Sequence, residues 1–287
     1  MIARLLTTAA VVFFAATAMA ADAIKKPILL VLTNEAKLGK TQGRTGFYLS
    51  EAAHPYEVFT KAGYKVTLAS PMGGFAPLDP KSFDEKDGTN AAFWKKFGSG
   101  EEKNATLGVK ETIPISGVNP ADYSAVFFAG GHGTMWDFRG NKDINRVTAT
   151  IYEDGGAVGA VCHGPAALVD VKLTDGTPLV KGKKVTAFTN DEEEAVGLAA
   201  VVPFLLQNQL EEAGATHVPA ENFAENAVAD GRLVTGQNPA SATKTAELLV
   251  AAMAKADGSE EPAADEKPAA EEAPKAEPVE EKEAEGE

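Results

Sequence analysis

Short runs of apolar residues alternate along the chain with stretches in which apolar residues recur every three or four positions. The run PILLVLT at residues 27–33 predicts a strand buried on both faces, and Ala52, Tyr56 and Phe59 predict a helix over about residues 49–62. This alternation predicts an α/β fold, a flavodoxin-like sandwich of a mostly parallel sheet with helices on both faces. Further strands are expected at 65–70, 124–129, 157–161, 184–188 and 232–235, and further helices at 144–151, 198–213 and 240–254.

Residues 71–119 interrupt the alternation. They are rich in Gly, Pro and Asp, and Phe93 and Trp94 mark only one possible short helix. Long irregular loops in compact domains are usually functional or disordered. We therefore expect this segment to be an insertion that lies over the sheet and over the site.

The two ends of the chain differ from the alternating region. Residues 1–20 have a basic start, a short apolar run and an A-x-A site, which predicts a cleaved signal peptide. The run is shorter than the roughly 20 apolar residues of a spanning helix, so no stable membrane insertion is expected after cleavage. The mature chain is then exported, periplasmic or secreted. Residues 257–287 carry thirteen acidic residues against three lysines and predict a disordered acidic tail, which leaves residues 21–256 as the folded domain.

Charge and cysteine content exclude some classes of function. The formal net charge is −14, but the tail accounts for −10, and residues 21–256 hold 23 basic and 28 acidic side chains. The basic clusters lack interleaved aromatic residues, so nucleic-acid binding is not expected. A single cysteine, Cys162, permits no intramolecular disulfide and leaves one free thiol in a chain expected to be exported.

Cys162 stands where a predicted strand ends and a helix is expected to begin, since Pro165 suits a first helical turn. Ala160 and Gly164 are small, as the sharp turn of a nucleophile elbow requires, and a helix N-terminus would stabilise a thiolate. The alternative is a buried packing residue, the commoner role of a lone cysteine. The adjacent His163 favours the nucleophile. Its backbone N–H is a better candidate than its ring, because neighbouring side chains usually diverge in a helix.

Two other stretches are candidates for the same site. The sequence GGHG at 130–133 follows a buried strand and either offers N–H groups to an oxyanion or forms only a tight turn. Trp136 replaces the last glycine of a dinucleotide fingerprint. Glu51 either belongs to the site or favours a helix dipole. Its E-x-x-H spacing to His54 has no second copy, and no histidine shows zinc-site spacing with Cys162, so neither a metal nor another cofactor is predicted.

Five stretches, in this order along the chain, resemble the ThiJ/PfpI superfamily, whose fold is like that of class I glutamine amidotransferases. The similar branch holds heat-shock chaperones with glyoxalase III activity, and the resemblance covers about residues 26–255. The stretches are GFYLSEAAHPYEVFTKAGY (46–64), AGGHGTMWDF (129–138), AVCHGPAAL (160–168), AFTNDEEE (187–194) and GRLVTGQNPASA (231–242).

The resemblance implies a role for each candidate residue. Cys162 would be the nucleophile, His163 its partner in a dyad or triad, and Glu51 the carboxylate that contacts the thiol and moves protons. The turn at Gly131, with the amide of His163, would hold the oxyanion. Glu193 is the candidate third triad carboxylate, although it lies in a run of four acids that a capped helix start also explains.

The implied activity is that of a glyoxalase III-type lyase (D-lactate dehydratase), which converts methylglyoxal and water to lactate without glutathione or another cofactor. Its substrate would be a small reactive carbonyl, and a homodimer is expected. The same residues would serve a protein deglycase or an amidase- or peptidase-like hydrolase. A stress-related holding chaperone is a further alternative, favoured if Phe75 to Trp94 form an exposed apolar patch. A redox sensor at Cys162 would lack a resolving cysteine.

Overall fold

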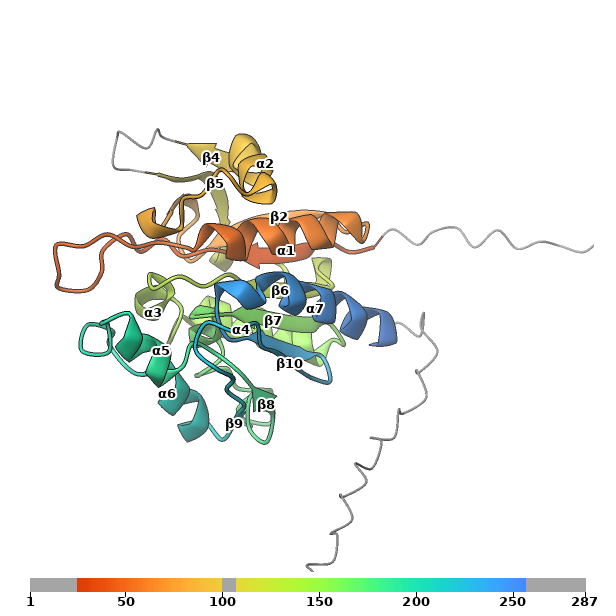
Figure 1. The fold of residues 1–287 in the computed structure, drawn as a ribbon. Helices are drawn as coiled ribbons and strands as arrows, with labels where there is room; N and C mark the ends of the chain where they lie inside the picture. Colours follow the sequence, from red (N-terminus) through yellow and green to blue (C-terminus); the bar gives the residue numbers. More distant parts are fainter. Residues whose placement is uncertain (1–24, 100–106, 257–287) are drawn as a thin grey trace, which may run out of the picture.

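The centre of the protein is a nine-stranded sheet, seen in a computed structural model that describes residues 25–99 and 107–256 (Figure 1). The expected signal peptide and acidic tail therefore lie outside the described residues. Six strands run parallel: β1 (Ile28–Val31), β2 (Val66–Ser70), β5 (Gly108–Pro114), β6 (Ala125–Phe128), β7 (Ala157–Val161) and β11 (Leu233–Gly236). The antiparallel strands at the edges are β3 (Gly74–Pro77), β4 (Gly98–Ser99) and β10 (Ala227–Asp230).

The strand order is β10-β11-β7-β6-β1-β2-β5-β3, with β4 also paired to β5. Its parallel centre, β2-β1-β6-β7-β11, is the flavodoxin-like order, so the predicted fold class is confirmed. The strand order reverses between β1 and β6. The chain crosses to one face of the sheet after β1 and to the opposite face after β6. Ligands of such sheets bind beyond the carboxyl ends of the strands near this point.

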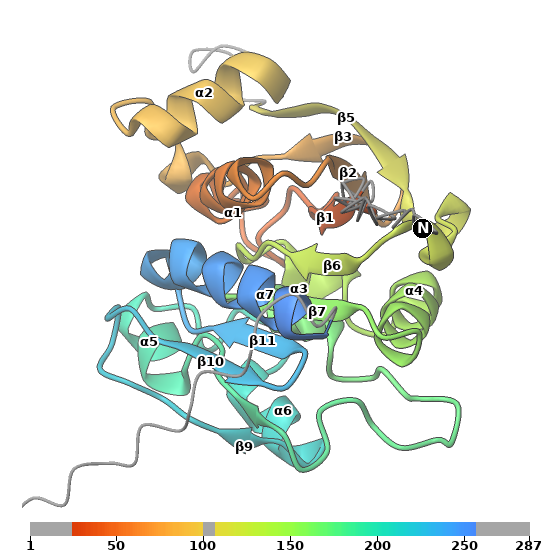
Figure 2. The ribbon, with the colours of Figure 1, turned by 90° about the vertical axis from the view of Figure 1, so that its right-hand side faces the viewer.

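Helices cover both faces of the sheet (Figure 2). One face packs against α1 (Leu49–Lys61) and α7 (Ala242–Ala256), and α2 (Gly88–Phe97) lies against α1. The other face packs against α3 (Thr134–Asp137), α4 (Lys142–Glu153) and α6 (Leu206–Glu212). Alternate residues of β1 enter the two cores, with Leu30 on the α1 side and Leu29 on the α4 side. Both cores are therefore formed by strands that are apolar on each face, as the continuous run at 27–33 predicts.

The expectation of an insertion over the site is wrong for most of residues 71–119. β5 pairs in parallel with β2, β3 and β4 pair with β5, and the segment extends one edge of the sheet. The pattern hid β5 because Lys110 and Glu111 are exposed, so the strand has no continuous apolar run. The exposed patch from Phe75 to Trp94 that would favour a chaperone does not form. Phe75 is 37% exposed, but Phe93 and Trp94 are buried, and Trp94 packs beside Phe83.

Two further predicted elements are shorter than expected. The strand at 184–188 reduces to β8 (Lys184–Val185), which pairs with β9 (Thr216–His217) in a separate small sheet. The helix at 198–213 begins only at Leu206, because Pro203 lacks the N–H that a continuous helix needs. Between them lies α5 (Asn190–Ala195). Within residues 25–99 and 107–256, no helix combines the length and apolar character required to span a membrane.

Candidate active site

Cys162 follows β7 on a strained turn. Its φ is +61°, a left-handed conformation that side chains other than glycine rarely adopt. The turn is tight, because a Cβ at Gly164 would lie 2.3 Å from the carbonyl oxygen of Phe128. This contact explains why the elbow requires a residue without a Cβ at position 164. The α-helix expected after the elbow is wrong: the chain forms only a four-residue 3-10 helix, Gly164–Ala167, so no long helix dipole points at the thiol.

The turn brings the side chains of Cys162 and His163 together although they are adjacent in sequence. The left-handed φ rotates Sγ toward the ring, and Sγ lies 3.2 Å from His163 Nδ1. His163 Nε2 lies 2.8 Å from Oε2 of Glu193, the fourth residue of α5. The three residues thus form a connected Cys–His–Glu chain of hydrogen bonds. The ring, which the sequence argument ranked below the amide, reaches the thiol.

Electrostatics keep the members of this chain in different protonation states. Burial works to raise the pKa of Glu193, but the neighbouring histidines outweigh it and hold the pKa at about 2. Burial lowers the pKa of His163, assisted by His132 and opposed by Glu193. Glu193 is therefore an anion at neutral pH, and His163 is a neutral imidazole that can accept a proton.

Glu51 reaches the thiol from α1 and is completely buried. Its Oε2 accepts the N–H of Gly130 at 2.7 Å, and its carboxyl group faces Cys162. Burial raises the pKa of Glu51 to about 8. Burial and the adjacent Glu51 also raise the pKa of the Cys162 thiol, because two neighbouring anions would be costly in a buried site. The pair therefore holds its protons at neutral pH until a reaction redistributes them.

Two backbone amides converge on the nucleophile. Gly131 has a φ of +99°, and a Cβ there would lie 2.3 Å from the carbonyl oxygen of Gly46. Its N–H is hydrogen-bonded to Cys162. The N–H of His163 has no acceptor among the described residues. These are the two amides that the sequence predicted to bind an oxyanion beside Sγ, and that role stays a prediction.

A pocket of about 230 Å³ opens over Cys162. It is walled by apolar side chains, and its polar groups come from the loop after β1, the segment after β3 and the turn after β6. The apolar walls are Leu38, Phe188, Val196, Leu198, Phe223 and Pro239, and the polar lining includes Arg44, Tyr48, Asp79, Lys81 and His132. Asp79 and Lys81 are the lining residues that the 71–119 segment contributes among those described. Its size and lining suit a small organic substrate.

The sequence matches the DJ-1/PfpI family over residues 44–252. The chain belongs to the DJ-1/PfpI family. It is 38% identical to glyoxalase 3 of Candida albicans over 233 residues, which cover 78% of this chain and 97% of that protein. It is 36% identical to the glutathione-independent glyoxalase HSP31 of Saccharomyces cerevisiae, with 77% of this chain and 95% of that protein covered.

Solved structures support the same assignment. The crystal structure of glyoxalase III from Candida albicans superimposes with a TM-score of 0.70 at 35% identity and covers 79% of this chain and 96% of that one. The Rapid Encystment Protein 24 KDa of Francisella tularensis superimposes with a TM-score of 0.73 at 38% identity and covers 79% of this chain and 99% of that one. The similarity to the glyoxalase III branch, inferred from the motifs, is confirmed.

In this DJ-1/PfpI chain, the sequence reasoning missed the side chain of His132. The GGHG turn had suggested backbone donors, but His132 Nε2 also lies 2.9 Å from Oε1 of Glu193. The rings of His132 and His163 are 4.1 Å apart between centroids. The feature of the sequence that could have revealed this side chain is a histidine within a glycine-rich turn at the end of a strand.

The sequence predicted no metal site from the spacing of its histidines, and this stays a prediction. Ligand atoms of His132, His163 and Glu193 lie within 4.8 Å of one another, a set that could hold a metal ion. No spacing motif reveals it, because the three residues come from three separate segments. Both nitrogen–oxygen distances, 2.8 and 2.9 Å, are those of hydrogen bonds, so a metal would have to displace two N–H protons.

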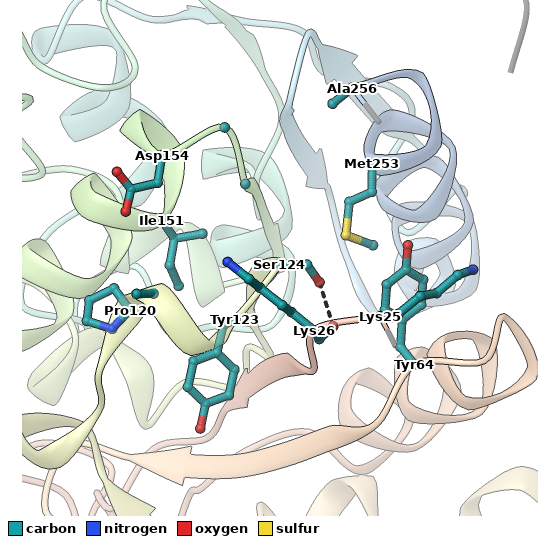
Figure 3. Close-up of a pocket in the computed structure, with 13 residues that line it drawn as sticks. Lys25, Lys26, Tyr64, Pro120, Tyr123, Ser124, Ile151, Asp154, Met253 and Ala256 are labelled. Atoms are coloured by element: carbon teal, nitrogen blue, oxygen red, sulfur yellow. Dashed lines mark hydrogen bonds between the residues drawn. The ribbon is translucent and has the colours of Figure 1, made fainter. Parts of the chain in front are cut away.

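A second cavity, of about 700 Å³, lies at the opposite ends of the strands (Figure 3). It is larger than the pocket over Cys162, and Lys25, Tyr64, Tyr123, Asp154 and Met253 surround it. The hydrogen bond from Ser124 Oγ to the carbonyl oxygen of Lys26 crosses its floor at 3.0 Å. This cavity has no thiol or imidazole in its lining, so the smaller pocket is the candidate active site of this family member.

Proposed function

We propose that this protein is a glutathione-independent glyoxalase that converts methylglyoxal and water to lactate. The observation that carries the proposal is the buried Glu51 carboxyl, with a pKa of about 8, beside the thiol of Cys162 and its two backbone amides. A thiol that adds to an aldehyde and a base that moves a proton between carbons are the two groups this isomerisation needs. The names of the relatives from two yeasts support the same activity.

The first step is addition of Cys162 Sγ to the aldehyde carbon. The thiol proton passes to His163 Nδ1, 3.2 Å away, and Glu193 stabilises the resulting imidazolium through Nε2. The carbonyl oxygen becomes an oxyanion, which the N–H groups of Gly131 and His163 bind. Protonation of this oxygen gives a hemithioacetal.

The second step moves a proton between neighbouring carbons. The carboxylate form of Glu51 removes the hydrogen of the carbon bonded to sulfur, and an enediolate forms. The hydroxyl proton on that carbon passes to the oxygen of the adjacent carbon. Glu51 then returns its proton to the adjacent carbon, which gives a lactoyl thioester. A pKa of about 8 makes Glu51 a stronger base than a solvated carboxylate while about a tenth of it is ionised at pH 7. Water then hydrolyses the thioester and releases lactate and the thiol.

The electron balance of the reaction is internal to the substrate. The aldehyde carbon is oxidised to the acid and the ketone carbon is reduced to the alcohol. The reaction therefore needs no external electron carrier, and the proton-moving groups named above suffice for it.

The decisive experiment is lactate formation from methylglyoxal by the purified protein without glutathione. Cys162→Ala and Glu51→Gln should each lower turnover by at least about 100-fold, because each removes a bond-making or proton-moving group. His54→Gln is the matched control on α1, since His54 contacts Thr243 and Asp87 outside the pocket. The proposal fails if the wild-type protein forms no lactate while iodoacetamide still alkylates Cys162 rapidly.

Hydrolysis of glycated adducts by the same residues is a second candidate, favoured by the pocket's size. Its volume of about 230 Å³ leaves room beyond the five non-hydrogen atoms of methylglyoxal, at about 30 Å³ for each water-sized group. Arg44 and Lys81 in its lining offer contacts to a larger substrate. The test compares kcat/KM for methylglyoxal with that for its adduct on N-acetyl-lysine. A higher value for the adduct would make the deglycase activity the principal one.

Export and a dimeric state belong to the same proposal. The leader pattern of residues 1–20 supports export to a periplasm or to the medium. Cell fractionation and the mass of the mature chain test it, since cleavage after Ala20 leaves Ala21 as the first residue. The expected homodimer is tested by sedimentation equilibrium, where a single species at the monomer mass would contradict it.

A further inference from the structure

The carboxylate of Glu193 is shared between two imidazoles. Its Oε2 bonds His163 Nε2 at 2.8 Å, and its Oε1 bonds His132 Nε2 at 2.9 Å. Each ring nitrogen lies at hydrogen-bond distance from its own carboxylate oxygen, and carboxylate oxygens accept, so each ring presents an N–H at Nε2. The neutral His163 then has a bare Nδ1, and this is the nitrogen that faces the Cys162 thiol.

The two histidines occupy different surroundings. The side chain of His163 is completely buried, whereas that of His132 is 15% exposed. His132 also belongs to the turn that carries the Gly131 amide, two residues after the Glu51 contact at Gly130. The carboxylate of Glu193 on α5 therefore bonds both His163, the base beside the nucleophile, and His132 in the turn that carries the Gly131 amide.

We propose that His132 is a positioning residue of the active site, which holds Glu193 in the rotamer that aims His163 at the thiol and fastens the oxyanion turn to α5. Without the bond at Oε1, the carboxylate can rotate about its terminal torsion, which is broad for glutamate. His163 would then lose its fixed tautomer, and the Gly131 amide would lose its connection to α5. This role deepens the proposed glyoxalase function and rests on it.

The role predicts a loss in turnover rather than in substrate binding. A proton acceptor and an oxyanion donor act mainly in the transition state, so their misplacement lowers kcat more than it changes KM. Loss of one oxyanion donor or of one orienting hydrogen bond commonly costs 10- to 1,000-fold in other enzymes. For a positioning residue we expect a loss of about 10- to 100-fold.

The test compares His132→Leu with His132→Gln in the full-length protein. Leucine removes the donor, whereas the glutamine side-chain amide has an N–H near the position of Nε2. We expect His132→Leu to lower kcat by about 10- to 100-fold with KM within about twofold, and His132→Gln to stay within about threefold of wild type. His54→Gln and His54→Leu serve as the matched pair outside the pocket and should leave kcat unchanged.

A spectroscopic readout separates this inference from the glyoxalase proposal. Long-range ¹H–¹⁵N spectra of the His163 ring should show a proton on Nε2 in the wild type and in His132→Gln, and a mixture of tautomers in His132→Leu. Alkylation of Cys162 should be slower in His132→Leu than in the wild type, and His132→Gln should keep the wild-type rate. Both measurements are informative even if methylglyoxal is not turned over.

The inference is overturned if His132→Leu keeps the wild-type His163 tautomer and the wild-type alkylation rate. It is also overturned if His132→Gln lowers kcat as much as His132→Leu does. Thermal unfolding of each variant shows whether it folds. If His132→Leu is unfolded, His132→Asn replaces it, because the shorter amide cannot reach Glu193 Oε1 and should behave as leucine does.

Discussion

Glu51, the proposed base, is a buried acid whose protonation also affects stability. Its pKa is about 8 in the folded protein, against an ordinary value of 4.5. Between these two values the folded state binds more protons than the unfolded state. The free energy of unfolding therefore falls as pH rises from 4.5 to 8, by about 1.4 kcal/mol for each unit of pKa difference.

We predict that Glu51→Gln is more stable than the wild type at pH 9, by a few kcal/mol, although it has lost turnover. Glutamine keeps an oxygen for the Gly130 N–H and carries no charge to bury. Urea unfolding at pH 5 and pH 9 measures the effect, and the two proteins should differ little at pH 5. Glu57→Gln, on the same helix but in contact with solvent, is the control. A wild type as stable as Glu51→Gln at pH 9 would contradict the raised pKa.

The elbow supplies a second prediction for a single residue. A Cβ at Gly164 would lie 2.3 Å from the carbonyl oxygen of Phe128, whereas a Cβ at Gly88 would meet nothing within 4 Å. Gly164→Ala should destabilise the protein by about 2 kcal/mol and lower turnover, because the backbone must move at Cys162. Gly88→Ala should be neutral or stabilise by up to about 1 kcal/mol. Thermal unfolding and lactate assays check both, and equal stability of the two variants would exclude the steric argument.

Among the elements, α5 is a short helix whose first turn positions Glu193, the proposed third member of the triad. Thr189 Oγ1 accepts the N–H of Glu192 at 3.0 Å, and Glu192 Oε2 accepts the N–H of Thr189 at 2.9 Å. Glu192 also holds Asn238 and the N–H of Phe223 through Oε1. The acidic run thus contains both a capping box and the catalytic candidate Glu193, so the two interpretations of this run are compatible.

We predict that Thr189→Ala lowers the free energy of unfolding by about 1 kcal/mol and also lowers kcat, since the loosened helix carries Glu193. Thr189→Ser should restore both values, because serine offers the same oxygen to the cap. Glu194→Ala, at an exposed position of α5, is the control for helix composition. A loss of stability with an unchanged kcat would mean that the cap does not position Glu193.

At the scale of the whole molecule, α7 closes the folded unit. It ends at Ala256, four residues after the end of the family match at residue 252, and its buried residues pack on β7 and β11. The remaining residues 257–287 carry −10 of the formal charge of −14, so a chain that ends at Ala256 carries −4.

We predict that truncation after Ala256 leaves the free energy of unfolding within about 0.5 kcal/mol of wild type and kcat unchanged. Solubility should fall, because charge of one sign keeps protein molecules apart. Chemical unfolding and light scattering at low salt check these outcomes. A large loss of stability would contradict the interpretation of the tail as a segment separate from the fold. A control chain that ends at Ala246 should unfold, since it lacks Leu249 and Met253 of the core.

The pattern of residues along the chain was sufficient to predict the parallel centre of the sheet and the elbow. β1, β6 and β7 are continuous apolar runs, and the small residues around Cys162 are local requirements of one turn. Such features depend on neighbours in sequence, so pattern and residue size reveal them. Pattern did not predict β5, because the exposed Lys110 and Glu111 interrupt its apolar run. It did not predict the break before α6 either, because one proline outweighed a helical pattern.

The assembly of the site depends on contacts between residues that lie far apart in the sequence. Glu51 meets Gly130 across 79 positions, and Glu193 meets His163 and His132 across 30 and 61. The packing of α5 against the elbow decides which carboxylate of the acidic run points into the site and which histidine contacts it. The raised pKa of Glu51 has the same origin, because burial is a property of the packed core and not of the residues beside it in sequence.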